Sequence, residues 1–280
     1  MAITRFRPEI WSAELLVALR KKLVYAGPGV VNRDYEGEIA QAGDTVRITS
    51  ISDPTIGTYS ANVTVVTPEE LTDAQRTLTV DQAKYFAFYV DDVDMRQAKG
   101  NVMPEAMRRA AYKLADQADQ FVAALYTGAQ AANAIGTINV TTAAIAEAQI
   151  IALKVKLDEA NVAQEGRFVT LPPWYHALLL ASDHFVRLDA SGTTEALRNG
   201  TVMRGFGFDI LVTNNAPLVT GDDYAVMAGV DSAISFAEQI NQVEAYRPEA
   251  KFADAVKGLY LYGAKLVRPD SIATLVASKT

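Results

Sequence analysis

The chain has 280 residues, of which 26 are basic and 33 acidic, for a formal net charge of −7. Half of the residues are hydrophobic and 21% are charged, a composition that excludes an intrinsically disordered chain. The length of the chain allows one large domain or two domains of roughly 150 residues. Cysteine is absent, which excludes disulfides, thiolate metal sites and a cysteine nucleophile. The acidic balance argues against a dedicated nucleic-acid-binding protein, and no apolar run reaches the ~18 residues of a membrane span. We expect a soluble chain made in the cytoplasm.

The first predicted element is an amphipathic helix from Pro8 to about Tyr25, which Gly27-Pro28-Gly29 ends. Its apolar side chains recur every four residues along one stripe: Trp11, Leu15, Leu19 and Leu23. Two roles stay open for a helix at this position. It packs either on its own core or on a neighbouring molecule.

Between Gly43 and Val90 the sequence alternates with period two, as β-strands do. The predicted strands are Thr45–Thr49, Asn62–Val65, Arg76–Asp81 and Tyr85–Val90. The stretch from Ile51 to Gln75 is rich in Thr, Ser, Asp and Glu and poor in large apolar residues, so its strands have little core beneath them. An isolated two-stranded ribbon is marginally stable in water. This ribbon is therefore either loosely packed or supported by something outside the chain.

The strongest predicted helix runs from Pro104 to about Tyr126, about 33 Å at ~1.5 Å per residue. Its apolar stripe consists of Met107, Ala111, Leu114, Ala118, Phe121 or Val122, and Leu125. The residues expected to face away are Arg108, Lys113, Asp116, Asp119 and Gln120. A helix of this length is expected to act as the backbone of the fold.

Helices and strands then alternate, which predicts an α/β layer of about 90 residues. The predicted elements are a helix capped by Thr141 or Thr142 and running to about Asn161, a strand at Gly166–Leu171, a helix at Trp174–Ala181, and strands at Phe208–Thr213 and Tyr224–Gly229. Beyond Asp231 the chain is mostly strand in character, most clearly at Gly258–Val267.

No motif for catalysis or metal binding stands out. His176 and His184 are the only histidines and lie eight residues apart, whereas helical metal ligands lie at i and i+4. Asp91-Asp92-Val93-Asp94 resembles a calcium loop only in charge, because the twelfth position is Val102 where the loop needs glutamate. Gly205-Phe206-Gly207 precedes a strand, whereas a phosphate-binding loop follows one. We expect no metal, no cofactor and no enzymatic activity.

Four groups of short strings carry a family resemblance through their identity and their order along the chain. They are Leu23–Tyr25 with Val31–Gly37 and Gly43–Ile48, Asp81–Phe88 with Asp91–Asp94, Gly207–Ile210 with Asn214–Pro217, and Phe252–Leu259 with Tyr262–Pro269. Together with the order of the elements, they resemble the major capsid (coat) protein of tailed phages, which has the Hong Kong phage-type capsid fold. The resemblance implies an α+β fold in four parts. These are an N-terminal arm over 1–42, an extended β-ribbon loop over 43–80, a peripheral domain with a long spine helix over 81–135 and 235–280, and an axial α/β domain over 136–234.

The function implied by the resemblance is structural. The chain would self-assemble into hexamers and pentamers of an icosahedral phage head in the virion, assembled in the host cytoplasm. The expected subunit contacts are Arg7 and Trp11 in the arm and Tyr59 and Arg76 in the loop. Some relatives cross-link through a loop lysine, but no lysine lies between Gly43 and Val80, so that chemistry is not expected.

The resemblance also implies partners. Because the loop begins within about 45 residues of Met1, leaving no room for a cleaved scaffolding segment, a separate scaffolding protein is expected, with a portal and a decoration protein. The head would enclose double-stranded DNA, which subunits of net charge −7 repel, so no sequence-specific binding of the DNA is expected. No membrane is expected as a partner. Two alternatives stay open: an encapsulin-like bacterial nanocompartment shell protein, and a soluble α+β enzyme without a recognisable motif.

Overall fold

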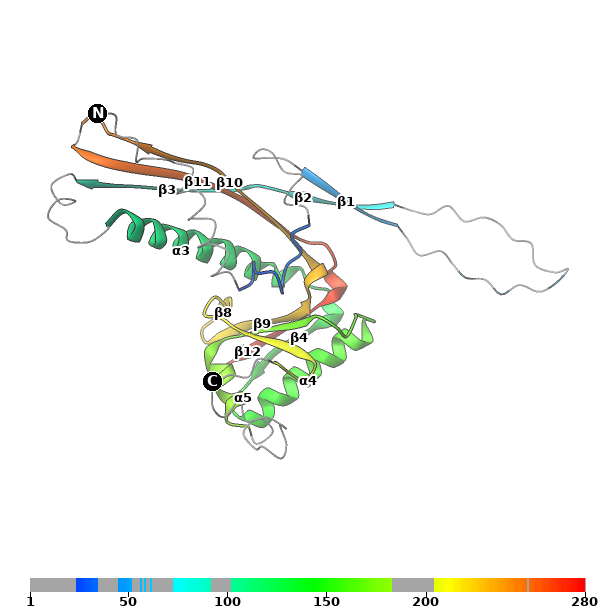
Figure 1. Cartoon of the computed structure of the whole chain (residues 1–280). Helices are drawn as coiled ribbons and strands as arrows, with labels where there is room; N and C mark the ends of the chain where they lie inside the picture. Colours follow the sequence, from blue (N-terminus) through cyan, green and yellow to red (C-terminus); the bar gives the residue numbers. More distant parts are fainter. Residues whose placement is uncertain are drawn as a thin grey trace.

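The computed structural model describes residues 24–34, 45–51, 56, 58, 61, 73–91, 102–182, 204–250 and 252–279. The predicted strand Asn62–Val65 lies outside these residues. So does the predicted helix from Pro8, apart from its last two residues, Val24 and Tyr25, which begin a series of turns. The described residues form a long three-stranded sheet with a helix along it, a seven-stranded sheet with two helices, and a two-stranded ribbon (Figure 1).

The helices are α3 (Val102–Ala123), α4 (Ala143–Glu159) and α5 (Pro173–Leu180). The strands are β1 (Thr45–Ile51), β2 (Asp73–Thr79), β3 (Gln82–Asp91), β4 (Ala134–Asn139), β5 (Arg167–Leu171), β6 (Arg204–Gly205), β7 (Phe208–Val212), β8 (Leu218–Thr220), β9 (Asp223–Val230), β10 (Ile234–Tyr246), β11 (Ala253–Leu266) and β12 (Ile272–Ser278). These bounds confirm the helices predicted from Pro104, Thr142 and Trp174 and the strands predicted in the described part of the chain.

The long sheet has the antiparallel order β10-β11-β3, and α3 runs along one of its faces (Figure 1). Alternate side chains of β3, namely Phe86, Phe88 and Val90, pack into the core beneath the sheet. The helix contributes its predicted apolar stripe, in which Met107, Ala111, Leu114, Ala118 and Val122 are buried. Phe121 and Leu125 are partly buried against the same core. The spine helix is thus held by hydrophobic burial along its length.

The expectation that Asp119 faces away from the core is wrong. Its side chain is buried, with 2% of the residue exposed. Asp119 follows the buried Ala115 by four residues and precedes the buried Val122 by three, so helical spacing places it on the inner face. A carboxylate is tolerated there because hydrogen-bond donors surround it, as described below.

The second sheet has the order β4-β12-β9-β5-β7-β6, and β8 pairs with β9. Its core is lined by Ile150, Leu153 and Leu157 of α4 and by Tyr175 and Leu179 of α5. The hydroxyl of Thr142 accepts a hydrogen bond from the N–H of Ile145 and caps α4, as the sequence predicts. Gly205-Phe206-Gly207 makes the tight turn between β6 and β7, with positive φ at Phe206 and Gly207, as type I′ hairpins require.

Strand β12 does not lie in the sheet that the expected domain division assigns to it. Residues 235–280 were grouped with the spine helix, but β12 pairs with β4 and β9 in the seven-stranded sheet. Every residue of β12 except Val276 is buried, as befits a central strand. A strand with apolar side chains on both faces carries no pattern that says which sheet it joins. The rest of the division stays a prediction.

Candidate functional site

The ribbon forms a small sheet of its own within the described part of the chain. Its strands β1 and β2 are antiparallel, with Thr45 opposite Thr79 and Ile51 opposite Asp73. Neither strand joins one of the larger sheets. Figure 1 shows the two strands reaching outward beyond the end of the long sheet. Beyond them, Ile56 is 95% exposed.

The root of the ribbon, in contrast, is firmly held. Leu78 and Val80 are buried against Ala237 and Leu261 of the long sheet. At Gly263 the chain that leaves β2 crosses β11 so closely that an added Cβ would lie 2.4 Å from the carbonyl oxygen of Thr79 and 2.9 Å from the Cα of Val80. Only glycine leaves room for this crossing. The ribbon is therefore anchored at its base, while its two strands pair only with each other in the part of the chain that the structure describes.

Arg76 is the only one of the four predicted contact residues that the structure describes. It is exposed, and its Nη1 donates a 3.4 Å hydrogen bond to the carbonyl oxygen of Leu266 at the end of β11. Arg7, Trp11 and Tyr59 lie outside the described residues. The structure thus places Arg76 at the base of the ribbon, and its role between subunits stays a prediction.

The arm segment, residues 24–34, is tied down first by Asp119. Oδ1 of Asp119 accepts hydrogen bonds from three successive main-chain N–H groups, those of Val24 at 2.9 Å, Tyr25 at 2.6 Å and Ala26 at 3.3 Å. Oδ2 accepts a 2.9 Å bond from Nδ2 of Asn215, in the loop after β7. One buried carboxylate therefore joins the arm, the spine helix and the seven-stranded sheet.

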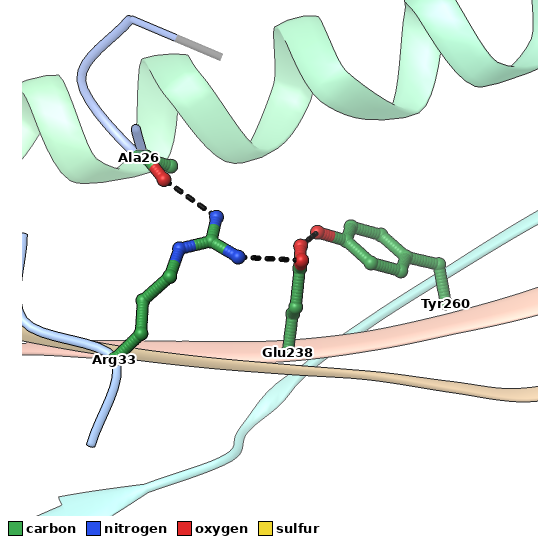
Figure 2. Close-up of polar contacts among 4 residues, drawn as sticks. All are labelled: Ala26, Arg33, Glu238 and Tyr260. Carbon is green, nitrogen blue, oxygen red and sulfur yellow. Dashed lines mark hydrogen bonds and ion pairs between the residues drawn. The ribbon is translucent and has the colours of Figure 1, made fainter. Parts of the chain in front are cut away.

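Arg33 provides the second attachment of the arm, as Figure 2 shows. Its guanidinium donates to Oε1 of Glu238 at 2.7 Å and to the carbonyl oxygen of Ala26 at 2.6 Å. It also lies 5.0 Å from the ring centroid of Phe236, a cation–π distance. The Glu238 side chain is only 5% exposed, so the ion pair is shielded from water.

Tyr260 completes this network from β11. Its hydroxyl donates a 2.6 Å hydrogen bond to Oε2 of Glu238 (Figure 2). Burial raises the pKa of the Tyr260 phenol well above its ordinary value, and the adjacent Glu238 carboxylate raises that pKa further. The phenol therefore stays a neutral donor, and the arm, β10 and β11 are held by one charged network.

The face of the long sheet opposite α3 carries an exposed aromatic surface, here called the tyrosine face: Tyr85, Tyr89, Tyr246 and Leu259. The exposed fractions are 81% for Tyr85, 54% for Tyr89, 43% for Tyr246 and 37% for Leu259. The strand pairings bring Tyr85 opposite Leu259, and Ala255 pairs with both Tyr89 and Tyr246. Between them, Lys257 forms a 2.8 Å ion pair with Glu244. Tyrosine is enriched where proteins meet, because its ring buries area and its hydroxyl stays solvated.

Sequence reasoning missed Asp119, Arg33, Glu238 and the tyrosine face. Helical spacing from Ala115 was sufficient to place Asp119 inside. Arg33 lay within a string that carried the family resemblance, but its partner Glu238 is 205 residues away. Within the described residues, no cluster of His, Asp or Glu side chains is arranged to hold a metal ion. No helix there is both long enough and apolar enough to cross a membrane.

Comparisons with known proteins agree with one another. The family model for phage capsid protein matches residues 74–275. A solved structure from Mycobacterium phage Che8 is 31% identical, with a TM-score of 0.76 over 92% of this chain and 91% of the other. The capsid of cyanophage P-SCSP1u is 18% identical, with a TM-score of 0.69 over 86% and 85% of the two chains.

A virus-like particle from Pyrococcus furiosus also shares the fold. It is 16% identical, with a TM-score of 0.55 over 95% of this chain and 98% of the other. No curated protein matches the sequence.

Proposed function

The chain belongs to the phage capsid protein family, and on that premise we propose that its ribbon and its tyrosine face are the surfaces through which copies join. It is a structural major capsid protein of a virion. The encapsulin-like alternative is not favoured, because the matching family model is that of phage capsids and the relative that is 31% identical comes from a phage. The resemblance to the Pyrococcus particle, at 16% identity, concerns the fold alone.

The ribbon carries this proposal. Within the described residues β1 and β2 pair only with each other, and an isolated two-stranded sheet is marginal in water. The ribbon is nevertheless held at its root by Leu78, Val80 and the close crossing at Gly263. A firm base aims the ribbon outward, and a neighbouring copy supplies the support that the described part of its own chain does not provide.

The tyrosine face is the surface proposed to receive a neighbour's ribbon. It is apolar, lies on a sheet already fixed by α3, and surrounds one exposed ion pair, Lys257 with Glu244. The ribbon of one copy and the sheet of another are different surfaces, so the contact is heterologous, and such a contact forms a ring when the rotation between copies closes. We propose that these rings are the hexamers and pentamers of an icosahedral head.

The remaining parts of the proposal concern what the shell does. The head encloses double-stranded DNA without gripping it, because subunits of net charge −7 repel phosphate. Assembly takes place in the host cytoplasm with portal, scaffolding and decoration proteins as partners. The chain acts through contact and performs no catalysis.

Deleting the residues between the two ribbon strands tests the proposal. Residues 52–72 are replaced by Asn-Gly, a two-residue turn that suits the facing pair Ile51 and Asp73. The variant is expected to fold, with the circular dichroism of the parent, and to stay monomeric in sedimentation. Intact shells from this variant would contradict the proposed role of the ribbon.

A second variant tests the receiving surface. Tyr85→Ser removes a ring that is 81% exposed, so the unfolding free energy of the subunit is expected to change by less than ~1 kcal/mol. Shell yield is expected to fall at least tenfold. A normal yield would remove the tyrosine face from the proposal.

A further inference from the structure

Helix α4 has an apolar outer surface that stays exposed among the residues that the structure describes. Its inner side packs on the seven-stranded sheet through Ile150, Leu153 and Leu157. Its outer side carries a second apolar row, here called the α4 stripe: Ala144, Ala148, Ile151 and Val155, all exposed. At 100° per residue these four positions fall within about 60° of arc. Ile151 is 45% exposed and Val155 is 47% exposed.

A solvent-facing helix surface is normally polar, and an apolar stripe on it marks a contact. The stripe is also nearly free of charge along its first half. From Thr141 to Ala152 the only charged residue is Glu147, whose carboxylate accepts a hydrogen bond from the hydroxyl of Ser182. The next charged side chain along α4 is that of Lys154.

A second exposed apolar surface lies on β8 of the same sheet, here called the β8 patch: Leu218, 59% exposed, and Val219, 42% exposed. Within the described residues β8 pairs only with β9, at the side of the main strand path. The segment from Thr213 to Thr220 contains no charged residue. In Figure 1 the β8 patch and α4 lie on different sides of this part of the molecule.

We propose that the α4 stripe of one subunit packs against the β8 patch of a second copy. This inference rests on the proposed function and adds one specific contact to it. Copies that each carry a net charge of −7 repel one another, so they meet with least cost where both surfaces are uncharged. The two surfaces differ, so the contact runs head to tail and repeats around a ring. Each partner contributes two half-exposed side chains, so a single contact is small. The contact becomes stable because it is repeated around the ring and is combined with the ribbon contact.

The absence of cysteine from the chain allows a clean test. Ile151→Cys and Leu218→Cys are introduced singly and together, and assembled particles are treated with a short bismaleimide that joins two thiols. The double variant is expected to give a ladder of covalent multimers on denaturing gels. Each single variant is expected to run as a monomer on the same gels, since each ring contact would bring only one thiol to the interface.

Two outcomes would overturn the inference: particles of the double variant that run as monomers, or dimers from Ile151→Cys alone, which would mean that α4 meets α4. The pair Val155→Cys and Val219→Cys repeats the test one turn along the helix. Particles of the unmodified chain, viewed by electron microscopy, report on the proposed function separately. Closed shells that give no ladder of cross-linked multimers would contradict the contact between α4 and β8 and would still support the capsid function.

Discussion

The main-chain N–H of Tyr25 donates a 2.6 Å hydrogen bond to Oδ1 of Asp119, a residue that is 94 positions away and 2% exposed. The neighbouring N–H groups of Val24 and Ala26 donate to the same oxygen. Three donors on one oxygen replace the water that a buried carboxylate loses, and no cation is needed to hold it there. The path of the arm is thereby set by a single side chain of the spine helix.

Asp119→Ala is expected to lower the free energy of unfolding by about 3 kcal/mol, because it leaves three N–H groups and the Asn215 amide without their acceptor. Denaturant titration of the free subunit measures this loss. Asp116→Ala is the matched control on the same helix, where the carboxylate accepts a hydrogen bond from the exposed Gln120. Equal effects for the two variants would mean that the Asp119 cluster does not stabilise the arm.

Glu238→Gln is expected to destabilise the subunit by about 3–5 kcal/mol, because Arg33 keeps its charge in a largely buried position and loses its ionic partner. Adding Arg33→Met to this variant should restore part of the stability, a coupling that a double-mutant cycle measures. Glu244→Gln, which breaks the exposed pair with Lys257, is expected to leave stability unchanged. Simple additivity of the two changes would show that Arg33 and Glu238 act independently.

Gly263→Ala is expected to cost about 1–3 kcal/mol, since the new methyl group meets the main chain of Thr79 and Val80, which cannot move aside cheaply. Thermal unfolding of the variant measures the cost. Gly29→Ala is the control, because no heavy atom lies within 4 Å of its added Cβ. A Gly263→Ala subunit as stable as the control would mean that the ribbon root does not cross β11 this closely.

The stability of the subunit is expected to fall with rising pH above about 10. Burial raises the pKa values of Tyr25, Tyr175 and Tyr260, with Glu238 adding to the effect at Tyr260. The unfolded chain releases these phenolic protons near pH ~10 while the folded chain retains them, so alkaline pH favours unfolding. Below about pH 10 the stabilisation that these buried phenols provide is fully present.

Denaturant titrations at pH 9 and pH 11 measure this effect. Tyr260→Phe is expected to be less stable than the parent at pH 9, where it loses the bond to Glu238, and to lose less stability between the two pH values. An identical pH dependence in the variant and the parent would contradict the assignment.

Local patterns were sufficient for most of the fold. The stripe Met107, Ala111, Leu114 and Ala118 predicts α3 because hydrophobic burial has the period of the helix. The alternation from Tyr85 to Val90 predicts β3 because successive side chains lie on opposite faces of a sheet. The cap at Thr142 is readable for the same reason, since an N-cap depends on neighbours three residues away.

Contacts between distant residues were not readable in this way. The hydrogen bond from Arg33 to Glu238 and the position of β12 beside β9 depend on how separate elements pack together. No local sequence pattern indicates this packing. The tyrosine face was hidden for a different reason: Tyr85 and Phe86 look alike as strand residues, and only the packing of α3 decides which one is covered.

Electron microscopy of the purified, unmodified chain, at micromolar concentration in near-physiological salt, tests the central claim most directly. The account predicts closed shells of uniform diameter, with the ribbon-deleted variant remaining monomeric beside them. An unmodified chain that stays a monodisperse monomer, with no particles in any field, would contradict it.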